Sequence, residues 1–145
     1  MSGDKTVMLT APAVGIALAL ATVVLGRAVG FERRTFYVAV TLVTASYYVL
    51  FAIMSGEPRA FAGDGAIALV FASIAIVGFK RNLYLVAVAL ALHALLDANH
   101  SALVSNPGTP AWWPPFCLTY DITAAAALAW QIRHSHVARL SRSLS

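Results

Sequence analysis

Three side chains that could hold a metal ion stand at helical spacing in one apolar run of the sequence. His93, Asp97 and His100 occupy positions i, i+4 and i+7 between Leu83 and Leu103. That spacing places all three on one face of a helix. Two imidazoles and a carboxylate on one face are the groups that Zn²⁺ and similar divalent ions bind.

The next apolar run, residues 114–132, carries Cys117 and Asp121 at i and i+4. At about 1.5 Å of rise per residue, Asp97 lies roughly 9 Å and Asp121 roughly 10 Å from the ends of their helices nearest the connecting segment. The two aspartates therefore lie at one level. Two carboxylates at one level could share a proton, pair with Arg59 or an imidazolium, or bind a metal, and the flanking histidines favour the metal. Cys117 is interpreted as a small buried side chain, with a role as a further ligand left open.

We therefore predict a metal site formed by His93, Asp97, His100 and Asp121 that holds Zn²⁺ or another divalent ion. No haem is expected, because two histidines on one helix could not reach both faces of one haem. A bound metal would lower the pKa of a water molecule toward about 7. An aspartate that is not a ligand, such as Asp121, would serve as the general base.

Ser46 and Tyr120 complete the predicted catalytic set, as groups that orient the substrate. Ser46 lies roughly 12 Å from the end of its own helix, at the level of the aspartates. The hypothesis is a metal-dependent hydrolase of a lipid or another amphiphile. Two alternatives stay open: a small proton- or cation-coupled transport or ligand-binding protein, and a structural accessory subunit whose polar side chains hold helices together.

The composition indicates how these residues are held. The chain has 145 residues, of which 60% are hydrophobic and 11% charged. A soluble domain has about a quarter charged residues. We therefore predict an all-α, single-domain, multi-pass membrane protein. Its five transmembrane helices would cover residues 7–25, 35–54, 61–79, 83–103 and 114–132, followed by a basic tail at 133–145.

The basic residues predict the orientation. Eight of the ten Lys and Arg residues fall on one side of a five-span arrangement, which would face the cytoplasm. The N-terminus would then lie outside and the C-terminus inside the inner (plasma) membrane. The expected partners are membrane lipid and an amphiphilic substrate from the outer leaflet. The net charge of +4 fits this membrane arrangement, so no nucleic-acid partner is expected, and a homo-oligomer is left open.

The segments HALLDANH (93–100) and NPGTPAWWPPFCLTYD (106–121) carry a resemblance. They are similar to an uncharacterised family of small bacterial multi-pass membrane proteins with a His-x3-Asp-x2-His helix. A more distant resemblance is to the alkaline ceramidase and adiponectin-receptor superfamily, membrane hydrolases with a Ser, an Asp and three His around zinc in a seven-helix bundle. That resemblance implies comparable roles for Ser46, Asp97, His93 and His100. The chain departs from it in having five predicted helices and no third histidine within them.

Overall fold

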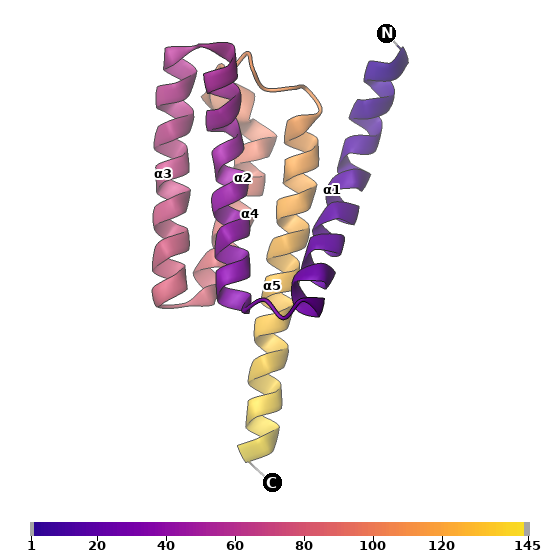
Figure 1. Ribbon diagram of the computed structural model, residues 1–145, viewed down its shortest axis with the longest axis vertical. Helices are drawn as coiled ribbons and strands as arrows, with labels where there is room; N and C mark the ends of the chain where they lie inside the picture. Colours follow the sequence, from indigo (N-terminus) through magenta and orange to yellow (C-terminus); the bar gives the residue numbers. More distant parts are fainter. Residues whose placement is uncertain (1, 144–145) are drawn as a thin grey trace.

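The computed structural model describes residues 2–143, which form an all-helical bundle (Figure 1). Successive helices run antiparallel, so the two ends of the chain lie at opposite ends of the bundle. This confirms the predicted all-α class. The helices are α1 (Ser2–Ala28), α2 (Arg33–Ser55), α3 (Pro58–Lys80), α4 (Leu83–Leu103) and α5 (Trp113–Ser143).

Four of these helices, α1 to α4, are long and apolar enough to cross a membrane. Large apolar side chains also cover the outside of the bundle, among them Leu9 (82% exposed), Met54 (72%) and Leu69 (70%). Such side chains suit a lipid environment, and the chain is a multi-pass membrane protein by these criteria. The fifth helix does not reach the same hydropathy, because polar residues such as Asp121 and Gln131 interrupt its apolar positions.

The helices extend beyond the predicted spans at several ends. The largest difference is at α5, which continues as a helix through most of the predicted tail, to Ser143. Residues 144 and 145 of that tail lie outside the described residues.

Short connections with capping residues define the helix ends. The Glu32 carboxylate accepts a hydrogen bond from the Thr35 amide and begins α2, and the Asn82 side chain does the same for α4. These side chains satisfy amides that have no partner within the helix. Gly56 ends α2 with φ of 69°, a left-handed conformation that glycine adopts without strain, and α3 begins two residues later at Pro58. Tight turns of this kind make consecutive helices antiparallel neighbours.

The fifth helix packs between α1 and α4, while α2 packs mainly on α3 (Figure 1). Gly15 lets α1 approach α5 closely, because a methyl group there would collide with the Phe116 carbonyl and the Thr119 hydroxyl. At this close contact the Thr119 hydroxyl of α5 donates a hydrogen bond to the Pro12 carbonyl of α1 at 2.9 Å. Small residues permit such close contacts between helices in a membrane, where water does not drive association.

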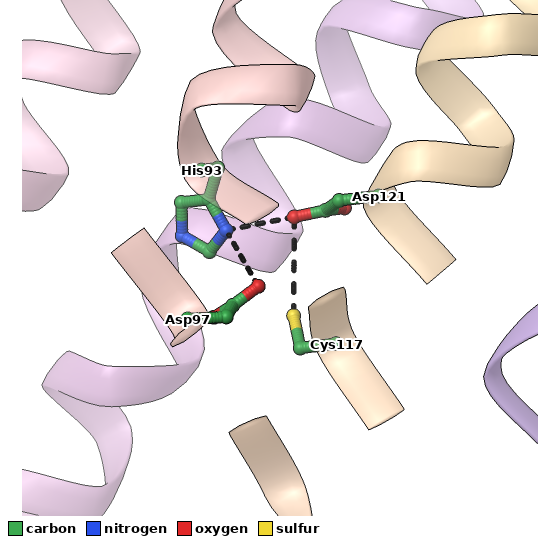
Figure 2. Close-up of side chains that lie close together, drawn as sticks. All are labelled: His93, Asp97, Cys117 and Asp121. Carbon is green, nitrogen blue, oxygen red and sulfur yellow. Dashed lines mark hydrogen bonds and ion pairs between the residues drawn. The ribbon is translucent and has the colours of Figure 1, made fainter. Parts of the chain in front are cut away.

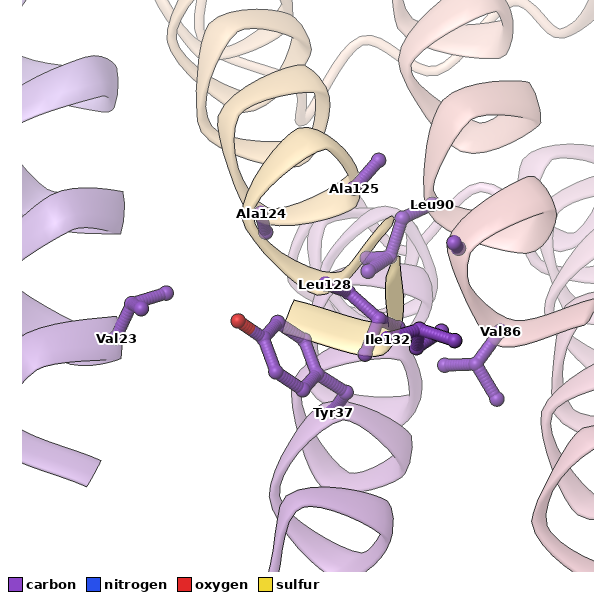
Figure 3. Close-up of a cluster of buried hydrophobic side chains, with 9 residues drawn as sticks. Val23, Tyr37, Val86, Leu90, Ala124, Ala125, Leu128 and Ile132 are labelled. Atoms are coloured by element: carbon purple, nitrogen blue, oxygen red, sulfur yellow. The ribbon is translucent and has the colours of Figure 1, made fainter. Parts of the chain in front are cut away.

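An apolar core fills the bundle around the first half of α4 and the middle of α5 (Figure 3). Val86 and Leu90 of α4 and Leu128 of α5 are completely buried in it. This core lies beyond His93, toward the end of the bundle that holds the α1–α2 and α3–α4 connections. The polar side chains of α4 therefore gather in the other half of the bundle. The core residues are Val23, Tyr37, Val86, Ala87, Leu90, Ala124, Ala125, Leu128 and Ile132.

Candidate metal centre

Four buried side chains meet between α4 and α5 (Figure 2). His93 and Asp97 come from α4, and Cys117 and Asp121 come from α5. One possible ligand atom from each lies within 4.8 Å of the others. All four are at most 2% exposed. The structure thus brings together residues that lie up to 28 positions apart in the sequence.

Helix geometry explains why these four side chains lie close together. In each helix the two residues are four apart and share one face, and the short α4–α5 connection makes the helices antiparallel. Neighbouring rings then hold His93 in place. The Phe71 ring packs edge-on against it with centroids 4.9 Å apart, and the Tyr48 ring lies 6.2 Å away.

His93 Nδ1 makes the central contact of the group. It lies 2.7 Å from Asp121 Oδ2 and 3.6 Å from Asp97 Oδ2. The Cys117 thiol donates a weak hydrogen bond to Asp121 Oδ2 over 3.9 Å. Zinc bonds of about 2.0–2.3 Å place tetrahedral ligands roughly 3.3–3.8 Å apart. The His93–Asp97 and Cys117–Asp121 distances are close to that range. The 2.7 Å distance between His93 and Asp121 would have to increase by roughly 0.6 Å for both to bind one ion.

Several polar atoms of this group have no hydrogen-bond partner among the described residues. They are His93 Nε2, Asp97 Oδ2 and Asp121 Oδ1. An unsatisfied buried polar atom costs free energy, and most native ones have a partner. Unpartnered carboxylate oxygens next to an imidazole and a thiol form a donor set that suits a divalent transition metal.

His100 belongs to a second polar group instead. Its Nε2 lies 2.7 Å from Oδ1 of Asp64 on α3, and the other oxygen of Asp64 accepts a 2.7 Å hydrogen bond from the Asn106 side chain. The predicted metal set therefore needs correction at His100. At the end of α4 the neighbour that faces His100 is α3, so the shared helix face does not bring all three α4 residues to one ion.

Tyr48 of α2 connects the two groups. Its hydroxyl donates to Asp97 Oδ1 at 2.8 Å, and its ring stacks on His100 with centroids 3.7 Å apart. The Tyr48 backbone carbonyl also accepts a hydrogen bond from Asn106. Four helices and the α4–α5 connection thus contribute to one buried polar layer.

The predicted substrate-orienting residues do not reach this layer. Ser46 is exposed on α2 and donates to the Val43 carbonyl at 2.8 Å. It borders an apolar groove between α2 and α3 instead. Tyr120 lies next to Asp121 in sequence but turns toward α1, where its hydroxyl is 3.1 Å from the Thr22 hydroxyl. The structure therefore places Ser46 outside the predicted site, and Tyr120 lies beside the four-residue group.

The sequence prediction missed Asp64, Tyr48 and Asn106. The third helix, α3, begins at Pro58 and holds Asp64 in its second turn, where the side chain is 2% exposed. An acidic residue within an apolar run was the available signal, since such residues usually face the bundle interior and serve a function. Asn106 follows a helix end, and its sequence context gives no comparable signal.

Two hollows border the metal centre. A cavity of about 420 Å³ beneath the α4–α5 connection is lined by Asp97 and His100 together with polar residues such as Asn106. A largely apolar groove of about 350 Å³ between α1, α2 and α5 reaches Cys117 and Tyr120. The polar cavity thus reaches the metal centre from the α4–α5 connection, and the apolar groove reaches it from between α1, α2 and α5.

The chain was compared with known proteins at three levels. No family model, no curated protein and no solved structure matches it. The resemblances drawn from the sequence stay predictions.

Proposed function

We propose that the protein is a five-span membrane protein that binds a divalent metal ion, Zn²⁺ in the first place, between α4 and α5. The observation that carries the proposal is the buried group of His93, Asp97, Cys117 and Asp121, with ligand atoms within 4.8 Å of one another. His93, Asp97 and Asp121 are the proposed ligands, and the Cys117 thiol lies beside them, which leaves the fourth position of a tetrahedral ion open for water. Compared with the predicted set, His100 is left out.

The fifth helix is proposed as the fifth span. It packs along both α1 and α4, which are long and apolar enough to cross a membrane. A helix held between two crossing helices crosses with them, and its buried polar residues are shielded from lipid. The end of the bundle near Arg27, Arg33 and Arg81 is proposed to face the cytoplasm, because basic residues concentrate there. The metal centre then lies in the outer half of the plasma membrane.

We propose hydrolysis of an amphiphile as the activity of this centre. A bound Zn²⁺ supplies a water molecule with a pKa near 7. The apolar groove that reaches Cys117 would hold an alkyl chain, and the polar cavity at Asp97 would admit water. Tyr120 lines the groove and could position the head of the substrate. The distant resemblance to the ceramidase superfamily makes an amide-linked lipid the first substrate to test.

Metal analysis tests the first part of the proposal. The full chain is purified in mild detergent and its bound metal is measured by mass spectrometry. We expect about one equivalent of zinc in the wild type and little in His93→Ala or Asp121→Asn. His134→Ala is the matched control, because His134 is an exposed histidine near the other end of the bundle. Zinc-free wild type, or equal zinc in all variants, would refute the metal site.

A substrate assay tests the second part separately. Purified protein is mixed with amide-linked and ester-linked lipids, and released fatty acid is followed with and without a chelator. Chelator-sensitive release supports the hydrolase. Metal-loaded protein that releases no fatty acid from either class would refute the hydrolase and leave the metal site intact.

A structural role is the alternative that the same contacts favour. Hydrogen bonds of His93 and Tyr48 to the two aspartates join α2, α4 and α5. Interhelical contacts of this kind contribute on the order of 0.6 kcal/mol each in membranes. A protein with only this role would lose stability in Asp97→Asn and Asp121→Asn and would bind no metal.

A further inference from the structure

Another cavity, separate from the hollows described above, lies at the opposite end of the bundle from the metal centre. It has a volume of about 640 Å³ and opens where α1 ends and α2 begins, against the second half of α5. Its walls combine basic, aromatic and amide side chains. The lining residues used below are Arg27, Arg33, Trp130, Gln131, His134 and Ser135.

The charged groups of this cavity are basic. Arg27 and Arg33 line it, and His134 is the third residue there that can carry a positive charge. None of the described residues that line it has an acidic side chain. The Glu32 carboxylate, next to Arg33 in sequence, instead accepts hydrogen bonds from the amide and hydroxyl of Thr35.

Contacts within the cavity hold the Arg33 side chain in place. Its guanidinium donates to the Gln131 carbonyl at 3.2 Å and to the Ser135 hydroxyl at 2.9 Å, which ties α2 to α5. A guanidinium has five N–H donors, so these two bonds leave others for a ligand. Arg27 projects from α1 on the other side, with its guanidinium 5.8 Å from the centre of the Trp130 ring. Two guanidinium groups around one hollow suit the several oxygens of a phosphate.

The location indicates a phosphate attached to a lipid. The cavity opens where two membrane-spanning helices end, and Trp130 beside it is half exposed, as is usual for tryptophan at a membrane surface. Leu20, Val24 and Arg27 stand at i, i+4 and i+7, so they share one face of α1. Leu20 and Val24 are 51% and 65% exposed. An acyl chain could lie along these residues while its headgroup reached Arg27.

We propose that this cavity binds the phosphate headgroup of an anionic phospholipid, with Arg27 and Arg33 as its ligands. The proposal rests on the proposed cytoplasmic orientation of this end of the bundle, and it does not depend on the metal centre or on the hydrolase. Basic pockets between helices at the cytoplasmic side of a membrane protein are suited to anionic lipid headgroups.

Native mass spectrometry of the full chain in detergent tests this site. Phosphatidylglycerol and phosphatidylcholine are titrated separately, and the bound lipid is counted. We expect the wild type to retain phosphatidylglycerol more tightly than phosphatidylcholine. Arg27→Gln is expected to weaken phosphatidylglycerol binding about fivefold, and Arg33→Gln about tenfold.

Arg34→Gln is the matched control. Arg34 is the neighbouring arginine on the same helix, but it donates to the Gly78 and Phe79 carbonyls at the end of α3 and does not line the cavity. Its replacement is expected to leave lipid binding unchanged. Arg27→Gln also guards against a folding artefact, because Arg27 is exposed and contacts α5 only through the Trp130 ring, without the interhelical hydrogen bonds that Arg33 makes.

Three results would overturn the proposal. Both lipids contain a phosphate, so equal retention of the two would show that the net negative charge of an anionic headgroup is not recognised. If Arg27→Gln and Arg34→Gln weakened phosphatidylglycerol binding equally, the lipid would be held by the overall positive charge of the surface and not by a specific site. Displacement of phosphatidylglycerol by millimolar inorganic phosphate would assign the cavity to the free anion.

Discussion

Replacing Asp121 with asparagine separates a metal site from a purely structural cluster. The substitution keeps the size of the side chain and removes its negative charge. Asp121 is completely buried, with one oxygen 2.7 Å from His93 Nδ1. A neutral amide is a much weaker zinc ligand than a carboxylate, so the variant is expected to lose the ion while the fold persists.

The size of the expected effect follows from linkage. An ion present at one hundred times its dissociation constant stabilises the folded state by about 2.7 kcal/mol. In a chain of about this length, 1 kcal/mol shifts the unfolding temperature by about 2–4 °C. Zinc should therefore raise the melting temperature of the wild type by roughly 5–11 °C and leave that of Asp121→Asn unchanged. Loss of one interhelical hydrogen bond alone would lower it by roughly 1–2 °C.

Asp64→Asn is the matched control for this experiment. Asp64 is also buried and also lies 2.7 Å from a histidine, but it is outside the four-residue group. Thermal unfolding of the three proteins is followed in detergent with added zinc and with a chelator. Asp64→Asn should keep the zinc-induced rise. A wild type that does not respond to zinc, or an equal loss of response in both variants, would refute the reasoning.

Three further predictions concern the surroundings of the centre. Tyr48→Phe removes the hydroxyl that donates to Asp97, and zinc affinity should fall about tenfold in a chelator competition assay; unchanged affinity would contradict a supporting role. Gly15→Ala places a methyl group against the α5 backbone and should cost about 1–3 kcal/mol in unfolding experiments, whereas Gly65→Ala, with no atom within 4 Å of the new methyl, should cost little. Hydrogen bonds at the start of α2 lower the pKa of Glu32 below 4.5. The stability it adds is therefore complete above pH 4.5 and is lost as the pH falls through the lowered value. Glu32→Gln should remove that part of the acid dependence of unfolding, and an unaltered pH profile would refute the cap.

Hydrophobic runs and helical spacing predicted much of this structure. Each apolar run became a helix, because a segment of about 20 apolar residues has few other ways to satisfy its backbone in a membrane. Spacing also brought Asp97 and Asp121 to one level, and the structure places both in one group. These features depend on local geometry, which a single sequence contains.

The errors come from what spacing cannot supply, namely which neighbour a side chain faces. His100 shares a helix face with His93, yet α3 provides its partner, Asp64. Ser46 matches the aspartates in depth, but it is exposed. The buried residues Thr44 and Tyr48 each lie two positions from it, on the other side of α2. Both outcomes depend on how helices are arranged around one another, and only the assembled bundle determines that.

The charges of the polar layer argue for a divalent ion. The buried ionisable side chains among the described residues include three carboxylates and two imidazoles: Asp64, Asp97, Asp121, His93 and His100. If all three carboxylates are ionised, these groups carry one excess negative charge even with both imidazoles protonated, and an uncompensated charge is costly in a low-dielectric interior. A divalent ion bound by His93 and the two aspartates would compensate both carboxylate charges of that group. A monovalent ion in the same place would leave a negative charge, so zinc should stabilise the fold where sodium does not.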